Sequence, residues 1–225
     1  MVIQREERMT AEFVVHGAAG SGSVPVEATL RLLGLPYLVV ENAPWASKAA
    51  ADAVGQVNRL RQVPAVILPG GELMTESAAI LIHLADSYPQ GGLSPAPDAP
   101  ERAQFLRWMT YLPAQVYSMF WVRDDPSRLA ADEAHEAVIL ERTAERIADC
   151  WRMMDEQVEP GDYILGDRLS VLDLYVTVMS RWTPRRKVFY ETAPKMGQVV
   201  RRVDADPRLT AFWAERMPFT GAWEG

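Results

Sequence analysis

The segment VPAVILPGGELMTES, residues 63–77, combines the residue types best suited to hold a small peptide-like molecule. Pro64 opens a predicted strand and cannot donate a backbone hydrogen bond. If the Val63–Pro64 peptide is cis, the Val63 N–H and C=O turn outward and can pair with an extended ligand. Glu76 and Ser77 open a predicted helix, whose free N–H groups and hydroxyl suit a carboxylate. The alternative is an ordinary hairpin without any ligand.

The elements that must position these residues alternate between strand and helix. Short apolar runs predict strands at 13–15, 37–40 and 65–68 and around Leu73. Helical spacing and stop signals predict helices at 24–33, 47–54 and from residue 77 onward. The first strand, helix and strand form a βαβ unit with parallel strands, and the turn PGG at 69–71 joins a hairpin. The predicted order is therefore β-α-β-α-β-β-α.

The chain changes character after this α/β region. SYPQGGLSPAPDAP, residues 87–100, is rich in proline, glycine and polar residues, as a linker is. Helices are predicted beyond it at 101–122, 132–158, 170–182, 194–203 and 207–216. Ser170 and Asp173 have the spacing of a capping box at the third of these. We therefore divide the chain into an α/β domain at 10–87, a linker at 88–100 and an all-helical domain at 101–225.

Composition excludes several function classes. With 48% hydrophobic residues, the chain can bury a substantial core. The net charge of −7 argues against a nucleic-acid partner, and the clusters at 185–187 and 201–202 are interpreted as solvated helix ends and loops. The single Cys150 cannot form an intrachain disulfide or a four-ligand zinc site, and we expect it to be a buried small hydrophobe. The three histidines lack metal-ligand spacing, so no metal is expected.

The compartment is inferred from similar observations. No apolar stretch approaches the ~20 residues of a membrane span. The start, MVIQREERMT, is charged and lacks the apolar core of a signal peptide. We therefore expect a cytoplasmic protein that does not bind membranes, with Met9 as a candidate for the natural start.

The motifs together resemble those of one family. The pattern VPAV…L…GG…L-T-E-S-A-A-I resembles the glutathione-binding segment of the cytosolic glutathione S-transferases. Residues 58–64 are similar to that family's N-P-x-G-x-V-P turn, with Arg59 in place of the proline and Arg61 in place of the glycine. GDRLSVLDLYV, residues 166–176, resembles the capping-box motif of its helical domain. The resemblance, of bacterial type, covers about residues 12–216 and implies a thioredoxin-like domain joined to a helical bundle.

The resemblance implies a role for each residue of the first motif. Val63, with Pro64 cis, would hold the cysteinyl backbone of glutathione. Ser77 and the backbone near Glu76 would take the γ-glutamyl carboxylate, and the Glu76 side chain would face the ammonium group. Gln62 would lie near the glycyl end.

The resemblance places the catalytic position in the turn between the first strand and first helix, residues 17–24. A side chain there would donate a hydrogen bond to the glutathione sulfur and favour the thiolate, which is the nucleophile. Lowering a thiol pKa of ~8.5 by about two units requires about 2.7 kcal/mol. Alignment points to Gly20 or Ser21; we favour Ser21, with Ser23 as competitor, because the turn contains no Tyr or Cys. Serines in such turns often serve only the turn itself, and Pro25 departs from the family's usual basic residue.

The first helix of the helical domain would supply the pocket for a second substrate. It is rich in aromatic residues, and we assign Met109, Leu112 and Tyr117 to the pocket. The alternative for each is a place in the core or at a dimer interface. Pro113 is expected to kink this helix and widen the cleft.

These features predict a glutathione transferase that joins the glutathione thiolate to small hydrophobic electrophiles. Peroxide reduction, isomerisation and dehalogenation would use the same site, and a non-catalytic binding or scaffold protein would keep the fold. A thioredoxin-like disulfide oxidoreductase is excluded because C-x-x-C is absent. The resemblance also implies a homodimer with a role in detoxification.

Overall fold

The protein was analysed as a computed structural model that describes residues 12–218, a range that leaves out the candidate start at Met9. Its N-terminal half contains a sheet with the strand order β2-β1-β3-β4. The strands are β1 (Phe13–Gly17), β2 (Tyr37–Glu41), β3 (Ala65–Ile67) and β4 (Leu73–Met74). β1 pairs in parallel with β2 and antiparallel with β3, which pairs antiparallel with β4. The βαβ unit and the hairpin are therefore confirmed.

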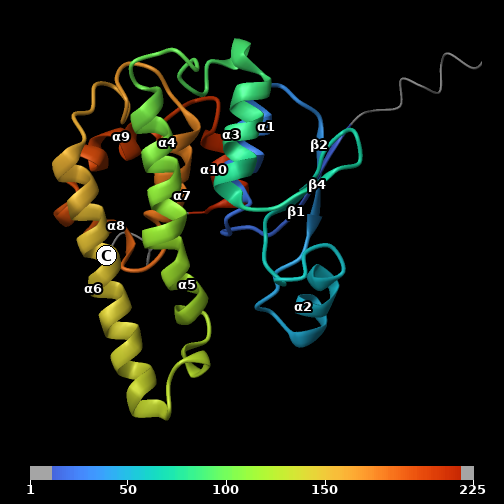
Figure 1. The fold of residues 1–225 in the computed structure, drawn as a ribbon, viewed down its shortest axis with the longest axis vertical. Coiled ribbons are helices and arrows are strands. Elements are labelled where there is room, and N and C mark those ends of the chain that lie inside the picture. The colour runs from blue at the N-terminus through green and yellow to red at the C-terminus, as the bar shows by residue number, and fades with distance from the viewer. Residues whose placement is uncertain (1–11, 219–225) are drawn as a thin grey trace, which may run out of the picture.

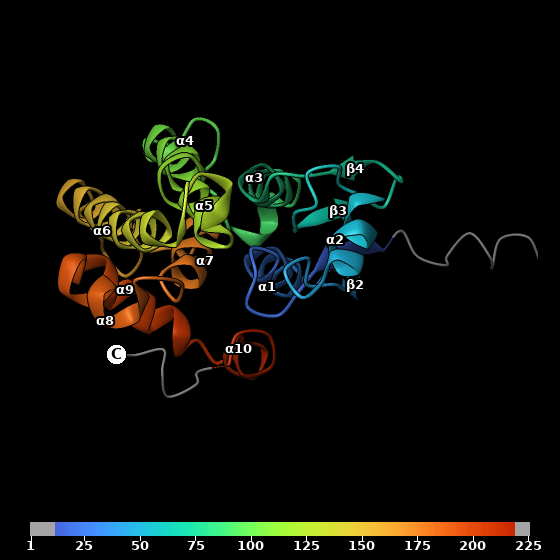
Figure 2. The same cartoon turned by 90° about the horizontal axis from the view of Figure 1, so that it is seen from below.

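Three helices complete this half, in the predicted order: α1 (Val24–Leu32), α2 (Lys48–Gly55) and α3 (Ser77–Ser87). Pro25 lies in the first turn of α1, where a missing N–H is tolerated. Figure 2 shows α1 and α3 between the sheet and the C-terminal helices. The two helices therefore join the sheet to the rest of the molecule.

The C-terminal half is all-helical (Figure 1). Its α-helices are α4 (Arg102–Tyr111), α5 (Ser118–Arg123), α6 (Glu133–Gln157), α7 (Val171–Met179), α8 (Arg185–Thr192), α9 (Pro194–Asp204) and α10 (Thr210–Arg216). A π-helical segment, Leu112–Tyr117, joins α4 to α5. Pro113 lies in that segment and lacks the N–H that an α-helix needs. The predicted long helix is thus present and is distorted at its proline.

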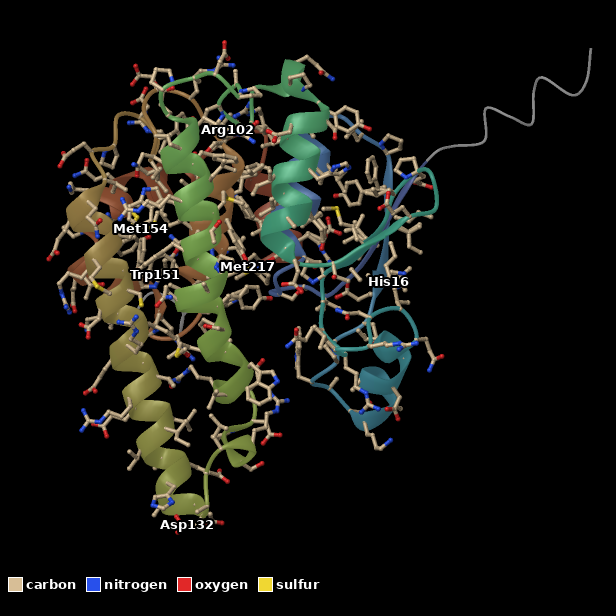
Figure 3. All side chains as sticks on the ribbon, in the orientation of Figure 1. His16, Arg102, Asp132, Trp151, Met154 and Met217 are labelled. Atoms are coloured by element: carbon tan, nitrogen blue, oxygen red, sulfur yellow. The ribbon has the colours of Figure 1, made fainter. Side chains whose placement is uncertain are left out.

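One hydrophobic core extends through both halves. It includes Val15 and Leu30 from the N-terminal half and Leu112, Trp151 and Leu174 from the helices. Figure 3 shows Trp151 projecting from α6 into the helical half. The two halves thus share buried apolar surface.

The central helix α7 begins with the expected capping box. Asp173 accepts hydrogen bonds from the N–H and the hydroxyl of Ser170, both at 2.8 Å. Its other carboxylate oxygen accepts from the Ile164 N–H at 2.8 Å. All residues of α7 are buried, so this box fixes the start of a helix that has no solvent-facing side.

Two sequence-based expectations in this half need correction. The cluster at 185–187 begins α8, a helix that the sequence analysis did not predict. Arg185 and Lys187 are exposed, as expected of a solvated helix end, but Arg186 is fully buried. Arg186 and the nearly buried Arg181 each form an ion pair with Asp204 at 2.7 Å. Buried guanidinium groups need such a partner, and the sequence does not reveal Asp204 as one. The helix predicted at 170–182 also ends earlier, at Met179.

Within residues 12–218, no helix is both long enough and apolar enough to cross a bilayer.

Candidate functional site

The Val63–Pro64 segment has the expected form. The peptide is cis. Neither the N–H nor the C=O of Val63 takes part in a hydrogen bond within residues 12–218, although the residue is only 7% exposed. A buried, unpaired main-chain segment is rare in proteins. It is suited to an extended ligand that supplies the missing partners.

The turn before Val63 holds it in place. The buried Asn58 donates from Nδ2 to the Gln62 carbonyl at 2.9 Å and accepts from the Leu60 N–H at 3.1 Å. Arg61, at the family's glycine position, has φ = 56°, the left-handed conformation that glycine favours. The turn therefore accommodates an arginine in the conformation that glycine favours.

The start of α3 is the predicted carboxylate site. Glu76 is exposed and has φ = 66°, another strained left-handed residue immediately before the helix. Ser77 is buried as the first residue of α3, and its hydroxyl lies 2.6 Å from that of Tyr175 on α7. The sequence analysis missed Tyr175, because it lies in the other half of the chain.

The turn after β1 holds its two serines in a closed set of hydrogen bonds. The Ser21 oxygen accepts from the N–H of Ala18 at 3.3 Å and of Ser23 at 3.1 Å, and the two serine hydroxyls lie 3.0 Å apart. Ser23 also lies 2.7 Å from the Glu27 carboxylate, a stronger acceptor than the Ala18 carbonyl at 3.3 Å. The single Ser23 proton therefore goes to Glu27, and the Ser21 proton goes to Ser23.

A charge network that is buried at Glu27 and exposed at Glu41 holds this turn. Arg216, at the end of α10, donates from Nε to Glu27 at 2.6 Å and from Nη2 to Glu41 at 2.8 Å. Glu41 in turn accepts from the Ala19 N–H at 2.8 Å, and the Arg216 carbonyl accepts from the Gly20 N–H at 2.8 Å. The turn is thus fixed by α1, by β2 and by a helix from the far end of the chain.

Aromatic residues of the helical half close over the same turn. Trp182 donates from Nε1 to the Gly20 carbonyl at 2.8 Å. The Tyr117 ring packs on Trp182, with centroids 5.0 Å apart, and a Cβ placed on Gly22 would lie 2.1 Å from the Tyr117 hydroxyl oxygen. Tyr117 therefore reaches the turn directly. Met109 and Leu112 do not, since both are fully buried in the core.

Cys150 and the two arginines at positions 59 and 61 lie in surroundings that indicate a structural role. Cys150 is fully buried, as expected, and burial raises the pKa of its thiol. Arg59 and Arg61 line a surface cleft with Asp52, which pairs with Arg61 at 3.1 Å. None of these groups adjoins the turn after β1.

Comparison with known proteins identifies the class. The sequence pattern of the glutathione S-transferase N-terminal domain matches residues 19–87, and that of the C-terminal domain matches residues 122–216. YncG of Escherichia coli K12, described as an uncharacterized GST-like protein, is 30% identical over 87% of this chain and 94% of its own. The glutathione S-transferase GstA of Escherichia coli O157:H7 is 24% identical over 84% of this chain and 92% of its own.

A solved structure supports the same fold. The glutathione transferase homologue from Sulfitobacter, with bound glutathione, aligns with a TM-score of 0.78 at 24% identity, covering 90% of this chain and 97% of that one. The fold is thus a thioredoxin-like domain packed against a helical domain. The chain belongs to the glutathione S-transferase family.

Proposed function

We propose that this protein is a glutathione transferase that adds the glutathione thiolate to small hydrophobic electrophiles. The observation that carries the proposal is the unpaired Val63 main chain beside a cis proline, in a chain of this family. Glutathione is an extended tripeptide and would supply the missing main-chain partners as co-substrate. The Sulfitobacter homologue of the same fold has bound glutathione.

We assign the binding roles to the two ends of the segment 62–77. Val63, immediately before cis Pro64, pairs with the cysteinyl backbone, and Gln62 lies near the glycyl end. Ser77 and the backbone at Glu76 take the γ-glutamyl carboxylate, and the Glu76 side chain attracts the ammonium group. The exposure of Glu76 and the helix start at Ser77 support this orientation.

We assign the thiolate contact within the turn to Ser21 rather than Ser23. Ser23 is fully buried and donates to Glu27, whereas Ser21 retains 5% exposure. The Ser21 proton points to Ser23 in the resting turn. A thiolate is a charged acceptor and competes favourably with that neutral oxygen.

Tyr117 would line the electrophile pocket, and Met109 and Leu112 would support it from the core. We further propose a cytoplasmic homodimer with a role in detoxification. Exposed hydrophobic side chains, among them Trp45 on the N-terminal half and Trp121 on the helical half, support an interface between subunits.

A second candidate is a family member that binds glutathione without catalysis. The inward-pointing Ser21 proton favours it, as do the replacements at Arg59 and Arg61. Peroxidase, isomerase and dehalogenase activities would use the same glutathione site and differ in the pocket.

Calorimetry of glutathione binding at two pH values tests these alternatives on the wild type, Ser21→Ala and Ser23→Ala. A transferase releases the thiol proton on binding, and we expect that release to diminish in Ser21→Ala. Binding without proton release in any variant would favour the non-catalytic protein. Absence of binding would refute a glutathione site.

A further inference from the structure

The Tyr117 hydroxyl lies against the turn after β1, the part of the proposed glutathione site assigned to the thiolate. A Cβ placed on Gly22 would lie 2.1 Å from the hydroxyl oxygen. The charge of Glu76, which precedes α3, contributes to raising the pKa of this hydroxyl. The hydroxyl thus reaches the proposed site from the helical half.

The ring cannot easily leave this position. It packs on Trp182 at 5.0 Å and edge-on against Phe120 at 6.4 Å. Trp182 is itself bound to the Gly20 carbonyl of the turn. The hydroxyl and the turn are therefore held by one rigid set of contacts, which is the preorganisation that charge stabilisation requires.

The Tyr117 proton is available, in contrast to those of the serines. None of the hydrogen bonds within residues 12–218 has the Tyr117 hydroxyl as donor, whereas the Ser23 proton goes to Glu27 and the Ser21 proton to Ser23. Burial is the main factor that raises the pKa of Tyr117, and Asp124 adds to it. The phenol therefore stays protonated, and remains a donor, throughout the neutral range.

We propose that Tyr117 is a catalytic residue whose hydroxyl donates a hydrogen bond to the glutathione sulfur and stabilises the thiolate from the helical half. This inference rests on the proposed glutathione site. The thiol proton leaves to solvent and Tyr117 keeps its own proton, so the step is an ionisation without covalent change to the protein. Ser21 contributes a second donor only after its proton turns away from Ser23.

The test is a titration of the thiolate absorbance of glutathione bound to the protein, which requires no electrophile. In Tyr117→Phe the ring and its packing stay, and we expect the bound thiol pKa to rise by about one unit, the effect of losing one hydrogen bond to a charged group. Glutathione affinity at a pH where the thiol is protonated should change less than twofold. Tyr111→Phe is the control, since that hydroxyl donates to the Cys150 carbonyl outside the site.

A second variant tests the same hydroxyl in case Tyr117→Phe fails to fold. Replacing Tyr117 with 3-fluorotyrosine keeps the shape and makes the phenol a stronger donor, so the bound thiol pKa should fall. An unchanged thiol pKa in both variants, with a raised one in Ser21→Ala, would overturn the assignment to Tyr117 and leave the proposed function intact. Failure of the wild type to bind glutathione would overturn both.

Discussion

At the scale of single residues, the Ser77 hydroxyl has one proton, which it can donate either to the Tyr175 hydroxyl or to a ligand carboxylate. A ligand carboxylate can only accept, so Ser77 must donate to it. The hydrogen bond of 2.6 Å between the two hydroxyls then requires Tyr175 to donate to Ser77. Tyr175 is fully buried, and burial raises the pKa of its hydroxyl, which keeps that proton in place. Tyr175 is thus a positioning residue for the proposed carboxylate site.

Tyr175→Phe should therefore weaken glutathione binding with little effect on the reaction of bound glutathione. Loss of one hydrogen bond that orients the Ser77 hydroxyl corresponds to about 1 kcal/mol, or roughly a fivefold rise in Kd. Calorimetry measures the Kd, and kcat at saturating glutathione should stay within twofold. If Ser77→Ala and Tyr175→Phe had additive effects on Kd, the two hydroxyls would act independently and this account would be wrong.

A second residue-scale prediction concerns pH. Burial, opposed by hydrogen bonds from Ile164 and Ser170, raises the pKa of Asp173 from 3.8 to about 6. Between these values the folded protein binds more protons than the unfolded chain, so the contribution of Asp173 to the free energy of unfolding falls as pH rises. The stability of the wild type minus that of Asp173→Asn should therefore decrease by about 2 kcal/mol between pH 4 and pH 7.

Denaturant unfolding at several pH values measures this difference. Asp206 is the matched control, because its hydrogen bonds with Arg208 lower the pKa of its carboxyl. The stability of the wild type minus that of Asp206→Asn should change with the opposite sign. A difference for Asp173→Asn that is constant with pH would contradict the raised pKa.

Sequence and structure agree best for residues that act locally. The cis Val63–Pro64 peptide and the helix start at Ser77 follow from a short motif, and both are present. Tyr175 lies 98 residues from Ser77, and Arg216 lies 189 residues from Glu27. Such contacts depend on how the two halves pack, and no pattern along the chain encodes that packing.

At the scale of elements, the turn before Val63 shows how a motif tolerates substitution. The Asn58 side chain closes this turn although arginine, not glycine, occupies position 61. A non-glycine residue in the left-handed region costs about 1–2 kcal/mol. Its exposed ion pair with Asp52 recovers little of that cost, because solvent screens it.

We therefore expect Arg61→Gly to stabilise the protein by up to about 1 kcal/mol, since glycine relieves the strain but adds freedom to the unfolded chain. Thermal or urea unfolding measures the change. Arg61→Ala is the informative companion, because it removes the ion pair and keeps the strain, and it should not be stabilising. A loss of stability in Arg61→Gly that matched the loss in Arg61→Ala would show that the side chain, not the backbone, determines stability here.

The helix missed by the sequence analysis has a physical reason at this scale. RRKVFYET, α8, buries only Arg186 and Phe189, so it has no apolar stripe to reveal it. Its place is fixed by the ion pair of Arg186 with Asp204 on α9. In contrast, α6 and α9 have several buried apolar positions at helical spacing and were predicted within a few residues.

At the scale of the whole molecule, polar contacts reinforce the shared core where the halves meet. Trp182 and Arg216 come from the helical half and bind the turn after β1. Tyr175 comes from α7 and binds the start of α3. The turn after β1 and the start of α3, the two parts of the proposed glutathione site, are therefore complete only when both halves are folded and packed together.

Arg216→Met tests this coupling. It leaves the Glu27 carboxylate fully buried without its cation, which costs about 3–5 kcal/mol. Because the core and the turn link the halves, we expect both to lose stability together, in a single unfolding transition at lower denaturant. Hydrogen exchange of β1 and α6 amides, read beside far-UV circular dichroism, measures the stability of each half.

Arg202→Met is the matched control for that change. The Arg202–Asp162 pair is about half exposed on both sides, so its loss should cost less than about 1 kcal/mol. If Arg216→Met destabilised β1 and left α6 unchanged, the halves would be separate cooperative units that touch. Equal losses in β1 and α6 would mean that a change at α10 affects the proposed glutathione site through the stability of the whole fold. The proposed transferase activity would then be lost at the denaturant concentration at which α6 unfolds.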